Sequence, residues 1–577
     1  WGGGLPGVWV VNDSIKNLAL VNGVNVLAVH TLDSTNTYDL TTKYWLHAGT
    51  SSATYFNDSA AHWFEFNTFE SNAAVVRINT FGRDIYKQHR VKGELDIVWD
   101  ANASVGSYSG ETHLSSQISI RKRGNGSLFS FPKNGYLFET KDGLWEDKDV
   151  EPLGMPEEED WILHGPWLDR TYSRNILTMH LARKTGHYAS RTAIAELFVN
   201  GEYEGVYILM ENIKRDKHRV DIAKLKPDEI SGDDLTGGYI WRVDWGDEDW
   251  LSSFYPHSST ASKLKYQYHV PDNDKIVPEQ ETYLQNTVDD FEHALQNTST
   301  TYKGKYWDEY IDVNSFVDYL LVQEFTKNYD AYRASAYFHK DKNSKDSLIK
   351  AGPVWDFNYS LGLTTNCQGY IPSGWYFNGP CSALTPMWWN KLVQTPEFAN
   401  RVNCRWKELR QGAFHKDSIF DFLAVQETML TDLSARDRER WYIEYGTAPL
   451  YSHFIDSTIA GDMDYMKTWI SDRLDWMDSN MIGTDCATIS IEEEIALRKD
   501  LRVYPNPSNG NVTMLLLNGL HGEFLIRNQL GQVVYFGTIE AGTTQLSIEL
   551  NHLENGIYFV EMENKGGRVY QKLMIQY

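Results

Sequence analysis

The segment GPVWDFN at residues 352–358 places an acidic side chain, Asp356, among apolar and aromatic neighbours. These neighbours predict that Asp356 is anchored in or beside a strand. A second acidic residue, Asp330, stands at the end of the segment EFTKNYD, where a run with helical spacing stops. A strand-like run at 336–339 and a turn at 342–344 lie between the two aspartates. A hairpin of this length would return Asp356 to the side of Asp330.

A carboxylate pair of this kind suits phosphoryl transfer. One carboxylate can take the proton of the acceptor hydroxyl, and the other can hold the metal ion that bridges the phosphates. Two aspartates with a purely structural role give the same spacing, so the spacing alone leaves both interpretations open. Signatures of other enzyme classes are absent, because the sequence contains no GxxxxGK[ST], HExxH or GxSxG.

Further segments extend outward from this pair in a fixed order. They are RGNGS (123–127) with FPK (131–133), LGMP (153–156) with DWILH (160–164), and NGEY (200–203) with GVY (205–207), followed by 328–337 and GPVWDFN. In this order they resemble the motifs of the CotH kinase family over roughly residues 115–480. The resemblance implies a divergent protein-kinase fold of the α+β class, without the usual glycine-rich loop.

By position, the resemblance makes Asp330 the catalytic carboxylate and Asp356 the metal-binding one. Asn358 stands where some relatives carry a second aspartate, and it would offer the metal a carbonyl oxygen without a charge. Lys133, expected on a strand, would neutralise nucleotide phosphates as a flexible point charge, and Arg123 would assist it.

The resemblance also gives Glu211 a role, that of orienting Lys133 through an ion pair. Simpler interpretations remain open for both residues: Glu211 is then a surface carboxylate at a hairpin end, and Lys133 a solvated surface lysine. The implied cofactors are ATP and a divalent metal, Mg²⁺ or Mn²⁺, with Ca²⁺ as a third option.

The predicted activity is transfer of phosphate from ATP to Ser or Thr of secreted or surface proteins. Another transfer from ATP, such as adenylylation, fits the same family. The alternative function is that of a catalytically inactive kinase-like scaffold that acts as an adhesin or binds glycans or matrix. The 20 Trp and 34 Tyr residues and the asparagine at position 358 favour this alternative.

The last part of the chain carries a separate resemblance. YPNPSNG (504–510) and LENGIYFV (553–560) are followed by KLMI (572–575). Together they resemble a type A sorting domain of type IX secretion. The resemblance implies a small β-sandwich that is read by the outer-membrane translocon, and therefore a protein that is secreted or held at the cell surface.

The predicted fold class is multidomain α+β. The predicted parts are a partial β-sandwich of jelly-roll or galactose-binding type (1–66), a β segment leading into the core (67–111), the CotH kinase-like domain (112–484), a linker (485–500) and the sorting domain (501–577). Asn-Gly pairs at 22–23 and 200–201 predict hairpins. Helical spacing predicts helices at 169–184, 278–296 and 314–327, with more helix over 386–480.

Composition limits the partners. The formal charge of −24 argues against the basic surface that nucleic-acid binding needs, and no apolar run is long enough for a membrane span. Four cysteines in an exported chain favour disulfides, and three pairings are possible. We favour Cys367–Cys381 with Cys404–Cys486, because the first pair brackets one loop; buried free thiols are the alternative.

Overall fold

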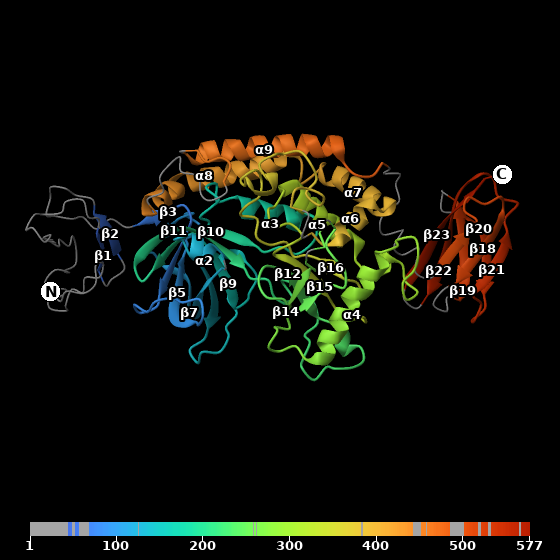
Figure 1. The fold of residues 1–577 in the computed structure, drawn as a ribbon, viewed down its shortest axis with the longest axis horizontal. Coiled ribbons are helices and arrows are strands. Elements are labelled where there is room, and N and C mark those ends of the chain that lie inside the picture. Colours follow the sequence, from blue (N-terminus) through green and yellow to red (C-terminus); the bar gives the residue numbers. More distant parts are fainter. Residues whose placement is uncertain are drawn as a thin grey trace, which may run out of the picture. The chain divides into compact units, whose positions relative to one another are not determined.

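A computed structural model describes residues 44–48, 52–56, 69–124, 126–257, 259–260, 262–381, 385–441, 452–456, 458–484, 501–516, 521–528, 532–564 and 567–576. The chain divides into two compact units, Trp1–Thr484 and Asp485–Tyr577 (Figure 1). The predicted linker and the predicted hairpin at 22–23 lie outside the described residues. Of the predicted jelly-roll module, the structure describes one antiparallel pair, β1 (Tyr44–Ala48) and β2 (Ser52–Phe56).

The first unit contains a closed barrel whose strands follow the order β10-β11-β9-β8-β7-β5-β4 (Figure 1). The strands are β4 (Ala74–Asn79), β5 (Val91–Val98), β7 (Thr112–Arg123), β8 (Gly135–Lys141), β9 (Asp160–His164), β10 (Thr192–Val199) and β11 (Glu202–Glu211). Parallel pairing of β10 with β4 closes the barrel. A short pair, β3 (Glu70–Ser71) and β6 (Gly106–Ser107), lies outside it. Apolar side chains, among them Val76, Ile97, Ile120 and Trp161, form one buried cluster of this barrel.

The hairpin predicted at Asn200-Gly201 is confirmed. β10 and β11 pair antiparallel, and the two turn residues have φ of 51° and 85°. Left-handed backbone at both positions is the geometry of a type I′ turn, which matches the twist of the flanking strands and favours Asn-Gly.

A second sheet follows the order β13-β14-β12-β15-β16. Its strands are β12 (Tyr239–Val243), β13 (Trp250–Leu251), β14 (Lys265–Val270), β15 (Ala336–Lys340) and β16 (Lys350–Ala351). The helices α4 (Pro278–Ala294) and α5 (Val313–Thr326) correspond to the predictions at 278–296 and 314–327. Aromatic residues make up much of the core here: Trp388 lies 5.0 Å from Phe338 and 5.1 Å from Phe291, between ring centroids.

The helix predicted at 169–184 is confirmed in part, since α3 covers only Arg174–Lys184. The carboxylate of Asp169 accepts the backbone N–H of Arg174 at 2.8 Å and so satisfies a free donor at the helix start. Residues 169–173 therefore form a turn before the helix. At the other end, Gly186 has a φ of 101°, as expected for a residue that terminates a helix.

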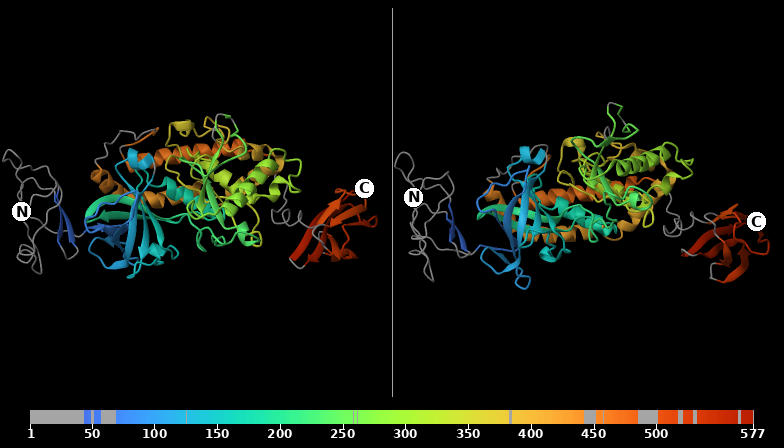
Figure 2. Two further views of the ribbon diagram at one scale, coloured as in Figure 1. Left: turned by 60° about the horizontal axis from the view of Figure 1, so that its bottom comes forward. Right: turned by 90° about the horizontal axis from the view of Figure 1, so that it is seen from below.

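The predicted helical region at 386–480 contains α6 (Met387–Gln394), α7 (Pro396–Leu409), α8 (Lys416–Arg440) and α9 (Ile459–Asn480). The helices α8 and α9 lie side by side, with α8 against β11 and α9 against α5 (Figures 1 and 2). Short helices complete the unit: α2 (Gly126–Ser130), η1 (Pro152–Gly154), η2 (Asp234–Thr236), η3 (Trp307–Glu309) and η4 (Asn366–Gln368). Within the described part of the chain, no helix combines the length and the apolar character of a membrane span.

The second unit is built of strands. β17 (Leu501–Tyr504), β18 (Asn511–Leu516) and β21 (Gln545–Glu549) form one sheet, and β20 (Val533–Ile539), β19 (Gly522–Asn528), β22 (Gly556–Asn564) and β23 (Gly567–Ile575) form the other. Met514 and Ile548 of the first sheet share a buried cluster with Ile526, Val560 and Leu573 of the second. The unit therefore has a hydrophobic core of its own.

The predicted Cys367–Cys381 disulfide is present, with the two Cα atoms 5.4 Å apart. This separation lies within the ordinary range for a disulfide. The other predicted pair includes Cys486, which lies outside the described residues.

Candidate functional site

Asp330 follows α5 in the turn that ends it. The helix stops at Lys327, which has a left-handed φ of 43°. The carbonyl of Asp330 then accepts the N–H groups of Arg333 and Ala334, at 3.2 and 3.0 Å. This turn leaves the Asp330 carboxylate half-buried, where its Oδ1 accepts the indole N–H of Trp245 at 3.3 Å.

Asp356 follows the hairpin that the sequence predicts. β15 pairs with β16, and the chain leaves β16 through Gly352, which has a φ of 110°. Asp356 itself has a φ of 60°, in the left-handed region that aspartate tolerates better than most residues. Its side chain is half-buried.

The structure brings Asp330 and Asp356 together. Burial raises the pKa of Asp330 to about 7, and the charge of Asp356 contributes to the rise. Burial also raises the pKa of Asp356, against the influence of Arg123. Both groups thus lie within electrostatic reach of each other in one half-buried site.

A third carboxylate belongs to this cluster, and the sequence analysis missed it. Asp244 directly follows β12, and its charge raises the pKa of both Asp330 and Asp356. Its Oδ1 accepts the N–H of Ser335 at 3.2 Å, and its Oδ2 lies 3.5 Å from Nε of Arg242. An acidic residue at the carboxyl end of an apolar strand was the available signal.

Arg123, one of the predicted nucleotide-binding residues, lies at the cluster. It is the last residue of β7, its guanidinium stacks over the Trp355 ring at 5.3 Å, and its charge lowers the pKa of Asp356. Burial in turn lowers the pKa of Arg123. Among the described residues, none forms a hydrogen bond or an ion pair with this guanidinium, so its donors remain available to an anion.

Asn358 adjoins Asp356, but its amide oxygen does not face the carboxylate. Its Nδ2 donates to Asp356 Oδ1 at 2.6 Å, and its Oδ1 accepts from Nδ2 of Asn175, also at 2.6 Å. The oxygen that was predicted to bind a metal is therefore hydrogen-bonded within the protein.

Lys133 does not occupy the predicted position. It lies in the loop before β8 and not on a strand, and its side chain is only 1% exposed. Its ammonium group donates to Asp437 Oδ1 of α8 at 2.5 Å and to the carbonyl of Val206 at 2.6 Å. A buried cation needs a partner charge, and Asp437 provides it.

The predicted ion pair between Glu211 and Lys133 is wrong. Glu211 ends β11 and is fully buried. Its carboxylate accepts hydrogen bonds from Nη1 and from the backbone N–H of Arg191, at 2.7 and 2.8 Å. It is consequently neither a partner of Lys133 nor a surface carboxylate. Glu211 and Asp437 are buried, and each forms an ion pair that links elements of the fold.

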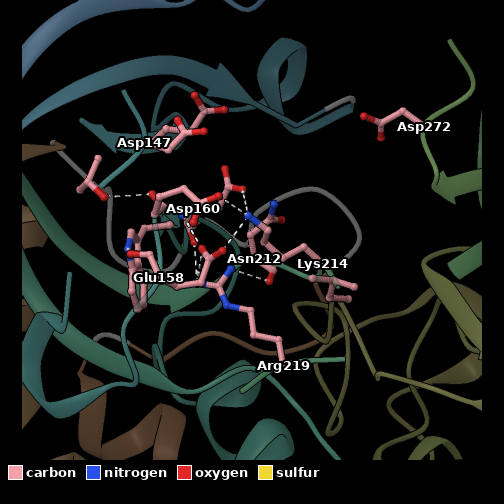
Figure 3. Close-up of polar contacts among 12 residues, drawn as sticks. Asp147, Glu158, Asp160, Asn212, Lys214, Arg219 and Asp272 are labelled. Atoms are coloured by element: carbon pink, nitrogen blue, oxygen red, sulfur yellow. Dashed lines mark hydrogen bonds and ion pairs between the residues drawn. The ribbon is translucent and has the colours of Figure 1, made fainter. Parts of the chain in front are cut away.

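A second acidic cluster lies at the start of β9. Single oxygens of Glu158, Glu159 and Asp160 lie within 4.8 Å of one another, which is close enough for three metal ligands. Lys214 points into this group and contacts all three, at 2.6, 2.7 and 2.8 Å, and Arg219 contacts Glu158 at 3.0 Å (Figure 3). Lys214 and Arg219 offset two of the three negative charges of this group. Among the described residues it is this group that shows three-ligand spacing, so the choice of the Asp330 cluster as a metal site rests on its motif positions.

A cavity of about 260 Å³ lies elsewhere, between α3 and the start of α8. It is lined by Leu177, His180, Leu181, Lys184, Gly412, Ala413, Ser418, Ile419 and Phe422. None of the predicted site residues lines it, so we base the functional argument on the carboxylates and not on this cavity.

Comparison with known families identifies both parts of the chain. Residues 502–576 match the secretion system C-terminal sorting domain, and the predicted resemblance of this region is confirmed. The protein is therefore exported, and is attached at the cell surface or secreted.

Residues 120–477 match the family described as CotH kinase protein, close to the range over which the motifs were recognised. The curated proteins offered no match to the chain. Since the matched region covers more than half of the sequence, the chain belongs to the CotH kinase protein family.

Proposed function

We propose that this exported protein transfers the γ-phosphate of ATP to Ser or Thr hydroxyls of secreted or surface proteins. The observation that carries the proposal is the meeting of Asp330 and Asp356 in one half-buried site, although they follow different elements of the chain. Phosphoryl transfer requires such a pair, one carboxylate for the acceptor proton and one for the metal.

The residues of the cluster fit a divalent cation and a phosphate. Burial is the main cause of the raised pKa of Asp330 and Asp356, and repulsion from neighbouring carboxylates, Asp244 among them, adds to it. A divalent cation would remove this repulsion, and Mg²⁺ is commonly held by one or two carboxylates together with substrate phosphates. The guanidinium donors of Arg123 suit a phosphate oxygen.

Asp356 would hold the cation, which supplies charge neutralisation to the phosphates when bound. Asn358 donates to Oδ1 of Asp356 and would steady the carboxylate that holds the cation. The proposal includes Mg²⁺ and Mn²⁺, and Ca²⁺ as the third option. Arg123, beside Asp356, would orient the phosphate chain of ATP.

Asp330 would act as the general base. Trp245 engages its Oδ1, so the acceptor hydroxyl would give its proton to Oδ2. The hydroxyl oxygen then forms its bond to the γ-phosphorus while the bond from that phosphorus to the β–γ bridging oxygen breaks, and ADP leaves. A carboxylate with a pKa near 7 is well matched to proton transfer at neutral pH.

The test is transfer of label from γ-labelled ATP with Mg²⁺ or Mn²⁺, to the protein itself and to a library of Ser- and Thr-containing peptides. We expect Asp330→Asn to lower the rate by about 10²–10⁴ and Asp356→Asn to abolish metal-dependent transfer. Asp247→Asn, an exposed aspartate on the loop after β12, is the matched control. Equal transfer by all four proteins contradicts the proposal, and transfer from α-labelled ATP alone would indicate adenylylation instead.

The alternative, a non-catalytic scaffold that binds glycans or matrix, is favoured by one further observation. Trp245 is 47% exposed beside Asp330, and exposed indole rings suit stacking on sugars. Calorimetry with ATP and Mn²⁺ separates the two functions. Absence of ATP binding together with retention on immobilised polysaccharide would support the scaffold.

A further inference from the structure

Two asparagine side chains connect α3 to the Asp356 carboxylate, and their orientation can be assigned from a backbone group. Asn175 is the second residue of α3 and is 5% exposed. Its Oδ1 accepts the backbone N–H of Phe357 at 2.8 Å. Because a backbone N–H can only donate, the atom that it contacts must be the amide oxygen of Asn175.

This assignment determines the remaining contacts. If the oxygen of Asn175 faces Phe357, its Nδ2 faces Asn358 at 2.6 Å and His164 Nε2 at 3.3 Å. The Asn358 atom that receives this hydrogen bond must be Oδ1. Asn358 Nδ2 then faces Asp356 Oδ1 at 2.6 Å, as a donor to a carboxylate.

We propose that Asn175 and Asn358 are positioning residues that hold the Asp356 carboxylate, and that Asn358 is not a ligand of the cation. This inference rests on the proposed function, since it concerns the cation that Asp356 would hold. Asn175 acts from a distance, because its amide contacts Asn358 and Phe357 and not the carboxylate. The Asp356 orientation is thus set by α3 as well as by its own loop.

The inference reverses the expected effect of one substitution. If Asn358 were a ligand, removal of the Asn175 amide would free Asn358 Oδ1 for the cation, and binding would stay the same or become tighter. If Asn358 positions Asp356, the same removal leaves the Asn358 amide free to turn, and its donor no longer holds the Asp356 carboxylate. Asn175→Ala therefore weakens cation binding if the inference holds.

The test is calorimetry of Mn²⁺ binding to the full chain, with and without ATP. Loss of a group that orients a metal ligand commonly costs about 10–100-fold in metal affinity, and we expect this loss for Asn175→Ala and for Asn175→Leu. Asn403→Ala is the matched control, because Asn403 is also a buried helical asparagine, 6% exposed, that donates to a carbonyl, that of Gly483 at 2.9 Å. We expect its Mn²⁺ affinity to equal that of the wild type.

Thermal unfolding of each variant verifies that it is folded, and Asn175→Leu remains informative should Asn175→Ala fail to fold. Tighter or unchanged Mn²⁺ binding by a folded Asn175 variant, when the wild type binds Mn²⁺ and transfers phosphate, overturns this inference and leaves the proposed function standing. A wild-type protein that binds neither Mn²⁺ nor ATP overturns the proposed function itself.

Discussion

The carboxyl group of Asp330 is half-buried next to two other carboxyl groups, and these surroundings raise its pKa to about 7 from an ordinary value of 3.8. The unfolded chain keeps the ordinary value. Between about pH 4 and pH 7 the folded protein therefore binds the proton more tightly than the unfolded chain does. The contribution of Asp330 to stability is favourable at low pH and is lost as the pH rises through this range.

Asp330→Asn removes this dependence, because an amide does not titrate. Relative to the variant, the metal-free wild type should lose stability between about pH 4 and pH 7, by roughly 1–3 kcal/mol. Urea unfolding of both proteins in the presence of a chelator measures the difference. Parallel pH profiles for the two proteins would show that the pKa of Asp330 is not raised.

Trp245 influences the pKa of Asp330 through one atom, its indole nitrogen. Its indole N–H favours the ionised form of Asp330, so Trp245→Phe should raise the pKa of Asp330. A hydrogen bond is worth about 1 kcal/mol and one pKa unit corresponds to about 1.36 kcal/mol. The acidic limb of the pH profile of kcat/KM should then move up by about 0.5–1 unit.

The control for this prediction is Trp145→Phe, a change in a partly exposed indole of the barrel, where the ring stacks on Lys92 at 3.8 Å. We expect its pH profile to coincide with that of the wild type. If the pH profile of Trp245→Phe also coincides with that of the wild type, the Trp245 indole does not affect the pKa of Asp330.

At the scale of elements, the docking of α8 on β11 depends on Asp437. Its side chain is 1% exposed. The carboxylate accepts hydrogen bonds from Lys133 Nζ, from the Val206 N–H at 2.7 Å and from the Tyr172 hydroxyl at 2.9 Å. The helix approaches so closely that a Cβ on Gly205 would lie 1.9 Å from Asp437 Oδ1. Lys133 therefore contributes to this contact and not to the carboxylate cluster.

Asp437→Ala leaves the Lys133 ammonium buried without a partner charge, and we expect it to lower the free energy of unfolding by about 3–5 kcal/mol. The double change Lys133→Met with Asp437→Leu should restore part of this loss. Urea unfolding measures both. If Lys133→Met alone abolishes ATP binding in protein shown to be folded, Lys133 is a nucleotide ligand and its structural assignment is wrong.

At the scale of the whole molecule, the two units have separate hydrophobic cores. The buried cluster of the sorting domain contains only residues from 501 onward, and the clusters of the first unit contain none of these. Neither unit requires the other to bury its apolar surface. Export and the proposed phosphate transfer therefore belong to different units.

A chain that ends at residue 500 should keep the Mn²⁺ and ATP affinities of the full chain, because all residues of the carboxylate cluster precede that point. The same truncation should abolish export, since it removes the matched sorting domain. Calorimetry on the purified protein and localisation in the producing cells measure the two effects. Loss of ATP binding in the truncated chain would contradict this division of roles.

Features set by residues close together in the sequence could be predicted. Features that depend on residues far apart in the sequence could not. The turn at Asn200-Gly201 and the hairpin that returns Asp356 towards Asp330 are local, and both were predictable from turn and strand patterns. The pair of Lys133 with Asp437 spans 304 positions, and no local pattern indicates such a partner. Asp244 had a local signal, an acidic residue at the end of an apolar strand, but its place beside Asp330 depends on the pairing of β12 with β15.

The central claim, that the Asp330 and Asp356 cluster is the metal and nucleotide site, is tested most directly by manganese anomalous scattering. The measurement requires crystals of the full chain grown with ATP and Mn²⁺. We predict a manganese peak within coordination distance of Asp356, with the ATP phosphates between it and Arg123. A peak at Glu158, Glu159 and Asp160 instead, or no peak near Asp356 in crystals that contain ATP, would contradict the account.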